Sequence, residues 1–124
     1  MTAVLVALAG ALGAALRYTV SVLLPDPGPD RVPRGTTAVN LVGSLLAGLL
    51  VGALAAGRLA PEVYLVALTG FCGGFTTFSS ASLETVRLVR AGELLRAAGY
   101  TLGMLAGTVA AAALGVALAR WLLG

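Results

Sequence analysis

The residues most able to do chemistry gather in a short stretch of an otherwise apolar segment, residues 69–80. The stretch reads Thr-Gly-Phe-Cys-Gly-Gly-Phe-Thr-Thr-Phe-Ser-Ser. Adjacent glycines followed by β-branched threonines make a poor continuous helix, so we expect a break here. A break frees backbone carbonyls that can bind a cation, while hydroxyls and the positive edge of a phenylalanine ring can face an anion. Within lipid, such a break is tolerated only where it lines a cavity or is buried in protein.

Two further polar residues lie inside apolar segments, where each is costly and therefore a functional candidate. Arg17 lies eight residues before Pro25 and either snorkels to the membrane interface or lines an anion vestibule. Asn40 either bridges two helices or donates its amide hydrogens to an anion. Weak donors and ring edges suit a small anion that must keep moving, because a fixed cation would hold it too tightly.

The composition excludes several classes of site. The chain has no histidine and one cysteine, Cys72. A Ser-His-Asp or Cys-His catalytic site, a histidine-ligated metal site and an intrachain disulfide are therefore excluded, and we expect no enzyme. Cys72 is interpreted as a small buried hydrophobe. The net charge of +3 comes from scattered arginines without any lysine, so we expect no nucleic-acid partner.

The elements that position these residues are predicted to be four membrane-spanning helices. Of the 124 residues only 10% are charged, against about 25% in a soluble domain. A spanning helix needs about 20 mostly apolar residues, and no alternation of period 2 indicates a barrel. The sequence thus predicts an all-α membrane protein with a break in the third helix, and a single domain over residues 1–124. The four predicted spans are Thr2–Leu24, Gly35–Ala56, Pro61–Val89 and Leu94–Leu123.

The connections between these spans carry their own signals. Proline-rich residues 25–30 cannot be helical, and Pro61 suits the first turn of a helix. Charged residues 84, 87, 90, 93 and 96 are three apart, so opposite charges can pair on what we interpret as a solvated helix end. The loops after the first and third helices carry five arginines and the other side two, which weakly favours both termini outside.

Small residues recur every four positions in the second and fourth helices. Gly99, Gly103, Gly107, Ala111 and Gly115 form such a stripe in the fourth. Stripes of this kind let helix backbones approach closely in lipid. They serve packing within one subunit, an interface between subunits, or both.

Three segments of the chain resemble the CrcB family, also called Fluc fluoride channels. They are residues 10–18 (Gly-Ala-Leu-Gly-Ala-Ala-Leu-Arg-Tyr), residues 35–44 (Gly-Thr-Thr-Ala-Val-Asn-Leu-Val-Gly-Ser) and residues 70–79 (Gly-Phe-Cys-Gly-Gly-Phe-Thr-Thr-Phe-Ser). Each is weak alone in a glycine-rich apolar chain. Together, in this order on a four-helix chain, they are a strong signal, and the resemblance covers essentially the whole chain, although the fourth helix matches loosely.

The resemblance implies a fluoride-selective channel that exports fluoride passively across the bacterial inner membrane and so lowers its toxicity. It implies a dual-topology, antiparallel dimer with two pathways and a central sodium ion held by the main-chain carbonyls of Gly73 and Thr76. By motif position, the implied fluoride pathway comprises Arg17, Asn40, Thr77, Phe78, Ser79, Ser80, Tyr100 and Thr108.

Two positions depart from the family pattern. Ala81 stands where a second phenylalanine is usual, and Met104 where a hydroxyl is expected. A homodimer would lack half of its aromatic groups, so either it conducts by a modified route or the chain pairs with a paralogue. A non-conducting partner subunit is the first alternative function. A small multidrug-type transporter is less favoured, because the first helix contains no carboxylate.

Overall fold

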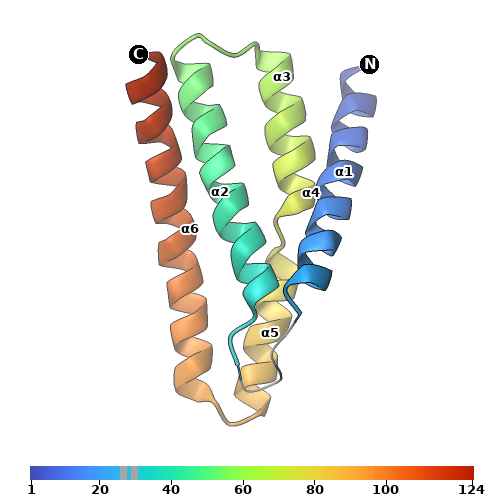
Figure 1. The fold of residues 1–124 in the computed structure, drawn as a ribbon, viewed down its shortest axis with the longest axis vertical. Helices are drawn as coiled ribbons and strands as arrows, with labels where there is room; N and C mark the ends of the chain where they lie inside the picture. Colours follow the sequence, from blue (N-terminus) through green and yellow to red (C-terminus); the bar gives the residue numbers. More distant parts are fainter. Residues whose placement is uncertain (26–27, 29–30) are drawn as a thin grey trace.

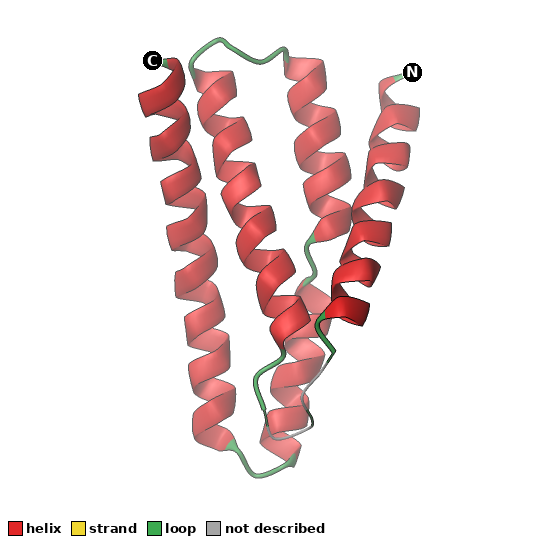
Figure 2. Ribbon diagram, in the orientation of Figure 1, coloured by secondary structure: helices red, strands yellow, loops and turns green. Residues whose placement is uncertain are grey.

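Each of the four apolar segments forms a helix, because backbone polar groups within lipid must bond to one another. The computed structural model describes residues 1–25, 28 and 31–124. It contains four helices that are long and apolar enough to cross a membrane, and both termini lie at the same end of the bundle (Figure 1). The described residues contain no strand (Figure 2). The elements are α1 (Thr2–Leu23), α2 (Arg34–Ala55), α3 (Pro61–Leu65), η1 (Val66–Cys72), α4 (Gly73–Phe75), α5 (Phe78–Arg90) and α6 (Leu94–Leu123).

The predicted spans are confirmed to within one or two residues at each end. Pro61 lies in the first turn of α3, as expected. Gly57 and Gly92 have φ values of +67° and +80°, which an L side chain rarely adopts, and they turn the chain after α2 and α5. Of the proline-rich connection predicted over residues 25–30, residues 26, 27, 29 and 30 lie outside the described part of the chain.

The third span contains the predicted break. Before the break, the span begins as the α-helix α3, continues as the wider π-helical segment η1 and ends with the short helix α4. Thr76 and Thr77 then adopt extended backbone angles, with ψ values of 163° and 119°. Figure 2 shows this connection as a short non-helical link between two helical halves. The Thr77 side chain caps α5 by accepting a hydrogen bond from the Ser80 amide.

Glycines set the closest helix contacts. α2 packs mainly against α6, where a Cβ on Gly48 would collide with the Ala112 carbonyl and one on Gly115 with the Leu45 carbonyl. α1 packs against η1 and α4, and a Cβ on Gly13 would meet the Phe71 carbonyl. Packing within one subunit is therefore confirmed for part of the small-residue stripes. A Cβ on Gly99 would meet nothing within 4 Å among the described residues.

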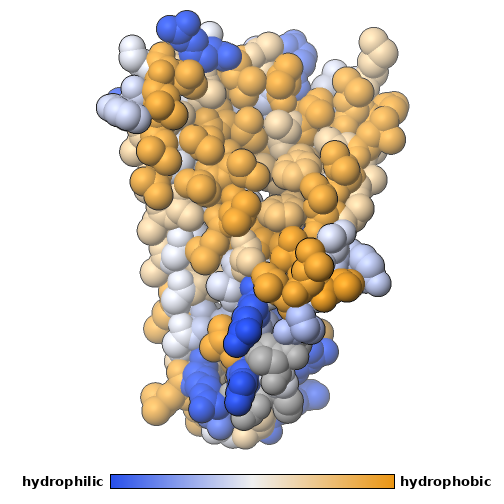
Figure 3. Space-filling model, viewed as in Figure 1, coloured by the Kyte–Doolittle hydropathy of each residue, from blue (hydrophilic) through white to orange (hydrophobic). Residues whose placement is uncertain are grey.

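Most side chains point away from the centre of this thin bundle. The fully buried large side chains among the described residues are Leu88 and Val39. A small cluster of Leu88, Ala97 and Tyr100 forms where α5 meets α6. Figure 3 shows a broad hydrophobic band with hydrophilic residues gathered at both ends. Such a surface suits a membrane, with the break held at the depth of the apolar band.

Candidate functional site

The broken backbone of the third span is held by one side chain from α2. Asn40 Nδ2 donates to the Thr77 carbonyl at 2.9 Å, and the Thr77 amide donates to Asn40 Oδ1 at 2.8 Å. Both residues are buried, with 8% of each exposed. Unpaired backbone groups at this depth would be costly, so the pair stabilises the break. Of the two uses predicted for Asn40, the bridge between helices is observed, and its anion role stays a prediction.

The same hydrogen bonds deprive two carbonyls of their usual helical donors. In a continuous helix the Gly73 carbonyl would accept from the Thr77 amide, and the Thr76 carbonyl from the Ser80 amide. Here the Thr77 amide donates to Asn40, and the Ser80 amide donates to Thr77 Oγ1 at 3.1 Å. The carbonyls of Gly73 and Thr76 therefore match the donor chemistry of the sodium site that the resemblance implies. Sodium itself stays a prediction.

Among the described side chains, no metal site competes with these carbonyls. In residues 1–25, 28 and 31–124, no group of three or more His, Cys, Asp or Glu residues is placed to hold a metal ion. Oxygen ligands without charge suit a weakly bound monovalent cation better than a transition metal.

A groove of about 620 Å³ runs beside the break and along α6. We call it the α6 groove, and it brings together predicted residues from three separate elements. Asn40 comes from α2, Thr77 and Phe78 from the break and the start of α5, and Tyr100 and Thr108 from α6. The two departures from the family pattern, Ala81 and Met104, line the same groove.

Most hydroxyl protons in the α6 groove are already engaged within the chain. Tyr100 donates to Glu84 Oε2 at 2.7 Å, and Thr108 donates to the Met104 carbonyl at 2.8 Å. Thr76 donates to the Cys72 carbonyl at 2.8 Å. These hydroxyls offer lone pairs to the groove, and an anion needs donors instead. Tyr100 and Thr108 are therefore poor first ligands for an anion in this arrangement.

Two side-chain donors among the described residues remain for an anion in the α6 groove. One is the second amide hydrogen of Asn40, which has only the Met104 thioether at 3.9 Å as its partner. The other is the hydroxyl of Ser44, which lines the groove and has no hydrogen-bond partner among the described residues. Ser44 was not among the predicted site residues. Its spacing of four from Asn40, which places both on one face of α2, is the signal that could have found it.

Glu84 was also missed, because it was grouped with a run of charges on a solvated helix end. Its carboxylate accepts hydrogen bonds from Thr36 Oγ1 and the Tyr100 hydroxyl, both at 2.7 Å. It thus links α2, α5 and α6 beside the groove, which Tyr100 itself lines. The solvated interpretation holds for Glu93 and Arg96, which pair at 3.5 Å at the exposed end, and it is wrong for Glu84.

A second cavity of about 280 Å³ lies on the other side of the break. Arg17, Thr36 and Ser80 line it, and Thr77 lines both this cavity and the α6 groove. The Arg17 Nε atom is buried and has no hydrogen-bond partner in the described part of the chain. Arg17 therefore lines a hollow, as one of its two interpretations required. Ser79 lies near the Thr77 hydroxyl at 3.3 Å and lines neither cavity.

The three phenylalanines take different positions. The Phe71 and Phe75 rings stack with centroids 5.6 Å apart and planes 14° apart. Phe78 lines the α6 groove and is 88% exposed. Phe78 is thus the ring that can offer its edge to a bound anion or to a second protein chain.

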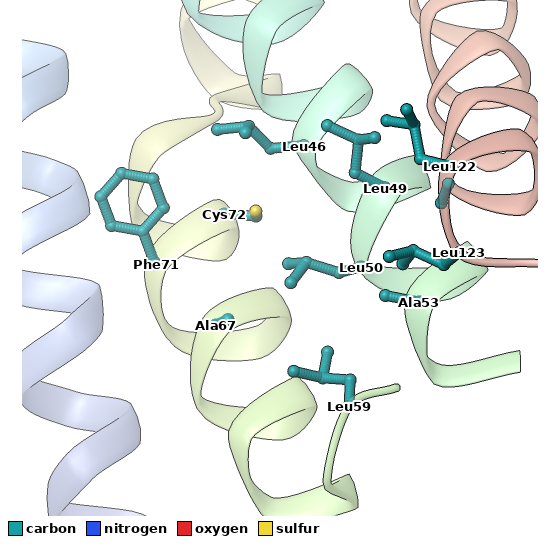
Figure 4. Close-up of a pocket in the computed structure, with 11 residues that line it drawn as sticks. Leu46, Leu49, Leu50, Ala53, Leu59, Ala67, Phe71, Cys72, Leu122 and Leu123 are labelled. Carbon is teal, nitrogen blue, oxygen red and sulfur yellow. The ribbon is translucent and has the colours of Figure 1, made fainter. Parts of the chain in front are cut away.

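A third cavity, of about 430 Å³, is almost wholly apolar. Figure 4 shows leucine side chains of α2 and α6 facing Cys72 across it. Cys72 is 5% exposed, which confirms its interpretation as a buried hydrophobe. The described residues that line this cavity offer no donor stronger than a thiol, so it suits an ion less well than the α6 groove does.

Comparison with known proteins identifies the family. The family model described as CrcB-like protein, Camphor Resistance (CrcB), matches residues 4–116. The chain belongs to the CrcB family. Its first motif supplies the glycines that let α1 contact the third span, its second supplies Asn40, and its third supplies the break.

Three curated relatives share nearly the whole length of this CrcB chain, and each is named fluoride-specific ion channel FluC. The relative from Agrobacterium fabrum is 48% identical over 118 residues, which is 94% of each chain. That from Anaeromyxobacter dehalogenans is 46% identical over 122 residues, covering 97% of this chain and 96% of the relative. That from Chlorobaculum tepidum is 46% identical over 117 residues, covering 94% and 92%. The chain is a multi-pass membrane protein, and these relatives are bacterial.

Proposed function

We propose that this chain is a fluoride channel that lets fluoride leave the cell passively across a bacterial membrane. The observation that carries the proposal is the name shared by relatives 46–48% identical over nearly the full chain. Those names describe ion channels rather than enzymes. A sequence without histidine also cannot form a histidine-based catalytic site. The α6 groove supports the proposal, because its free donors are uncharged.

Uncharged donors suit the transport of a small anion. Asn40 Nδ2 and the Ser44 hydroxyl replace part of the water lost when fluoride enters the α6 groove. The edge of the Phe78 ring adds a positive surface without a full charge. Arg17 lies across the break in the second cavity, where it attracts anions without binding them inside the groove. An ion held this way keeps moving.

An antiparallel dimer would complete the pathway. Three features of the single chain support a partner: Phe78 is 88% exposed, Gly73 is exposed at the break, and nothing lies near a Cβ built on Gly99 or Gly103 among the described residues. A second copy facing the break would cover all three. A sodium ion on the carbonyls of Gly73 and Thr76 from both copies would offset their negative dipoles at the interface.

A partner-subunit role is the second candidate, and a specific observation favours it. Ala81 and Met104 both line the α6 groove, where a ring and a hydroxyl are expected. A paralogue would supply the missing ring in a heterodimer. The uneven distribution of arginines between the two ends fits a chain with one preferred orientation.

Ion efflux from liposomes tests these candidates. The purified chain is reconstituted alone, and fluoride and chloride release are recorded with ion-selective electrodes. A fluoride channel releases fluoride rapidly and chloride hardly at all. No release of either ion would overturn the stand-alone channel, and fluoride release that returns only with a co-reconstituted paralogue would identify a partner subunit. Equal release of both ions would contradict selectivity.

A further inference from the structure

The second amide hydrogen of Asn40 has an unusual partner for a buried donor. Asn40 Nδ2 bonds the Thr77 carbonyl at 2.9 Å, and its other contact is the Met104 sulfur at 3.9 Å. A thioether is a weak acceptor. The second amide hydrogen of Asn40 is therefore covered by the Met104 sulfur, which binds it only weakly.

Met104 also interrupts the line of hydroxyls on α6. Tyr100, Met104 and Thr108 are four residues apart, so they share one face of the helix and line the same groove. The Met104 side chain packs against the cluster of Leu88, Ala97 and Tyr100. An ion that moves along this face meets the thioether between the two hydroxyls, at the level where Asn40 reaches across from α2.

We propose that Met104 is a displaceable cap on Asn40, and that fluoride takes the place of the sulfur when it enters the α6 groove. This inference rests on the proposed channel function and deepens it by naming a residue that governs access to the donor. Fluoride accepts hydrogen bonds strongly, so it gains more from the Asn40 amide than the sulfur loses. The three rotatable bonds of methionine let the side chain move aside without shifting α6.

The cap also favours fluoride over weaker acceptors. Displacing Met104 costs more contacts for a larger anion, while the return from the Asn40 amide and the Ser44 hydroxyl depends on how strongly the anion accepts. Chloride is larger and accepts more weakly, so it offsets less of that cost. Met104 is then a specificity-determining residue that this chain has in place of a hydroxyl.

Methionine-methyl NMR tests the cap directly, because the chain has only two methionines, Met1 and Met104. The full chain is labelled with 13C-methyl methionine, reconstituted in lipid and titrated with fluoride, with chloride at matched concentration as the control anion. We expect fluoride to shift the Met104 methyl signal while the Met1 signal stays in place. An unchanged Met104 signal, or an equal shift with chloride, overturns the cap.

Two variants test its consequence for transport. Met104→Ser removes the cap and is expected to raise fluoride efflux roughly two- to tenfold, the effect of one weak hydrogen bond, and to raise chloride efflux by a larger factor. Met104→Leu keeps the apolar volume over Asn40 and is expected to leave both rates no higher than the parent chain. Equal rates in Met104→Ser and the parent, or the same rise in both variants, overturn the cap.

The channel function and the Met104 cap can be disproved separately. If the parent chain and both variants release no fluoride, the stand-alone channel function is wrong, and the cap is overturned with it. If the parent chain conducts fluoride selectively while the Met104 methyl signal and the Met104→Ser rates do not change, the channel stands and the cap alone is overturned.

Discussion

Asn40 and Thr77 exchange two hydrogen bonds across 37 residues of sequence, at 2.8 and 2.9 Å, in the middle of an apolar bundle. Main-chain groups that a helix would pair internally are paired here by a side chain from a neighbouring helix. The amide is well suited to this because it carries both a donor and an acceptor on one rigid plane. The break and the donor offered to the α6 groove therefore depend on the same residue.

Replacing Asn40 is expected to weaken the fold as well as transport. In Asn40→Ala the Thr77 amide and carbonyl both lose their partner, and two buried unsatisfied groups cost about 2–5 kcal/mol together. Thermal unfolding in detergent measures this loss. Thr37→Ala is the matched control, because among the described residues the Thr37 side chain bonds only to the Pro33 carbonyl of its own helix end. Similar melting temperatures for the two variants would contradict the role of Asn40 at the break.

Replacing Ser44 is expected to affect transport and leave stability almost unchanged. Ser44 has no hydrogen-bond partner among the described residues, so Ser44→Ala breaks no internal bond. Loss of one donor to a bound anion lowers fluoride efflux roughly two- to tenfold. Liposome efflux and thermal unfolding are measured on the same preparations. Ser44→Thr, which keeps the hydroxyl, is the control, and unchanged efflux from Ser44→Ala would remove Ser44 from the pathway.

The sequence predicted the spans and the break well, because both follow from local properties. Runs of about 20 apolar residues indicate spans, and the glycines and threonines around Gly73 and Thr76 disfavour a continuous helix. These signals do not depend on which helix lies next to which. Only the segment bounds shifted, by one or two residues.

The hydrogen-bond partners could not be predicted, because they depend on how distant segments meet. Glu84 looked like one of several surface charges, and only the approach of α2 and α6 reveals that it accepts bonds from Thr36 and Tyr100. The loss of donor capacity at Tyr100 follows from the same contact. Residue types indicated a polar pathway, and the packing decided which protons are free within it.

Glu84 gives a prediction of its own, since its two donors act on one carboxylate. Tyr100→Phe and Thr36→Val each remove one hydrogen bond to a charged acceptor, with an expected loss of about 1.5–3 kcal/mol. Because both changes remove a donor to the same carboxylate, their effects should not simply add. The free energy of unfolding lost in the double variant should differ from the sum of the two single losses by about 0.5 kcal/mol or more. Tyr18→Phe is the control, as Tyr18 is 72% exposed. Strict additivity in thermal unfolding would show that Glu84 does not couple the two.

The glycines of α6 give a prediction that separates packing within the chain from packing between chains. Gly115 lies against the Leu45 carbonyl, so Gly115→Ala must push α2 and α6 apart and destabilise the single chain. A Cβ on Gly103 has nothing within 4 Å in residues 1–25, 28 and 31–124. Gly103→Ala should therefore stabilise an isolated chain slightly, by up to about 1 kcal/mol of helix propensity.

A larger substitution at Gly103 tests whether this face of α6 lies in the interface of an antiparallel dimer. A Cβ at Gly103 meets nothing within 4 Å in the described chain, and Gly103→Leu should abolish the dimer if that face of α6 meets a second copy, since bulky side chains prevent close backbone approach in lipid. Size-exclusion chromatography with light scattering in detergent measures the oligomeric state, and Leu102→Ala, on an exposed neighbour, is the control. A Gly103→Leu protein that remains dimeric would show that this face of α6 lies outside the interface. In that case its fluoride efflux should match that of the parent chain.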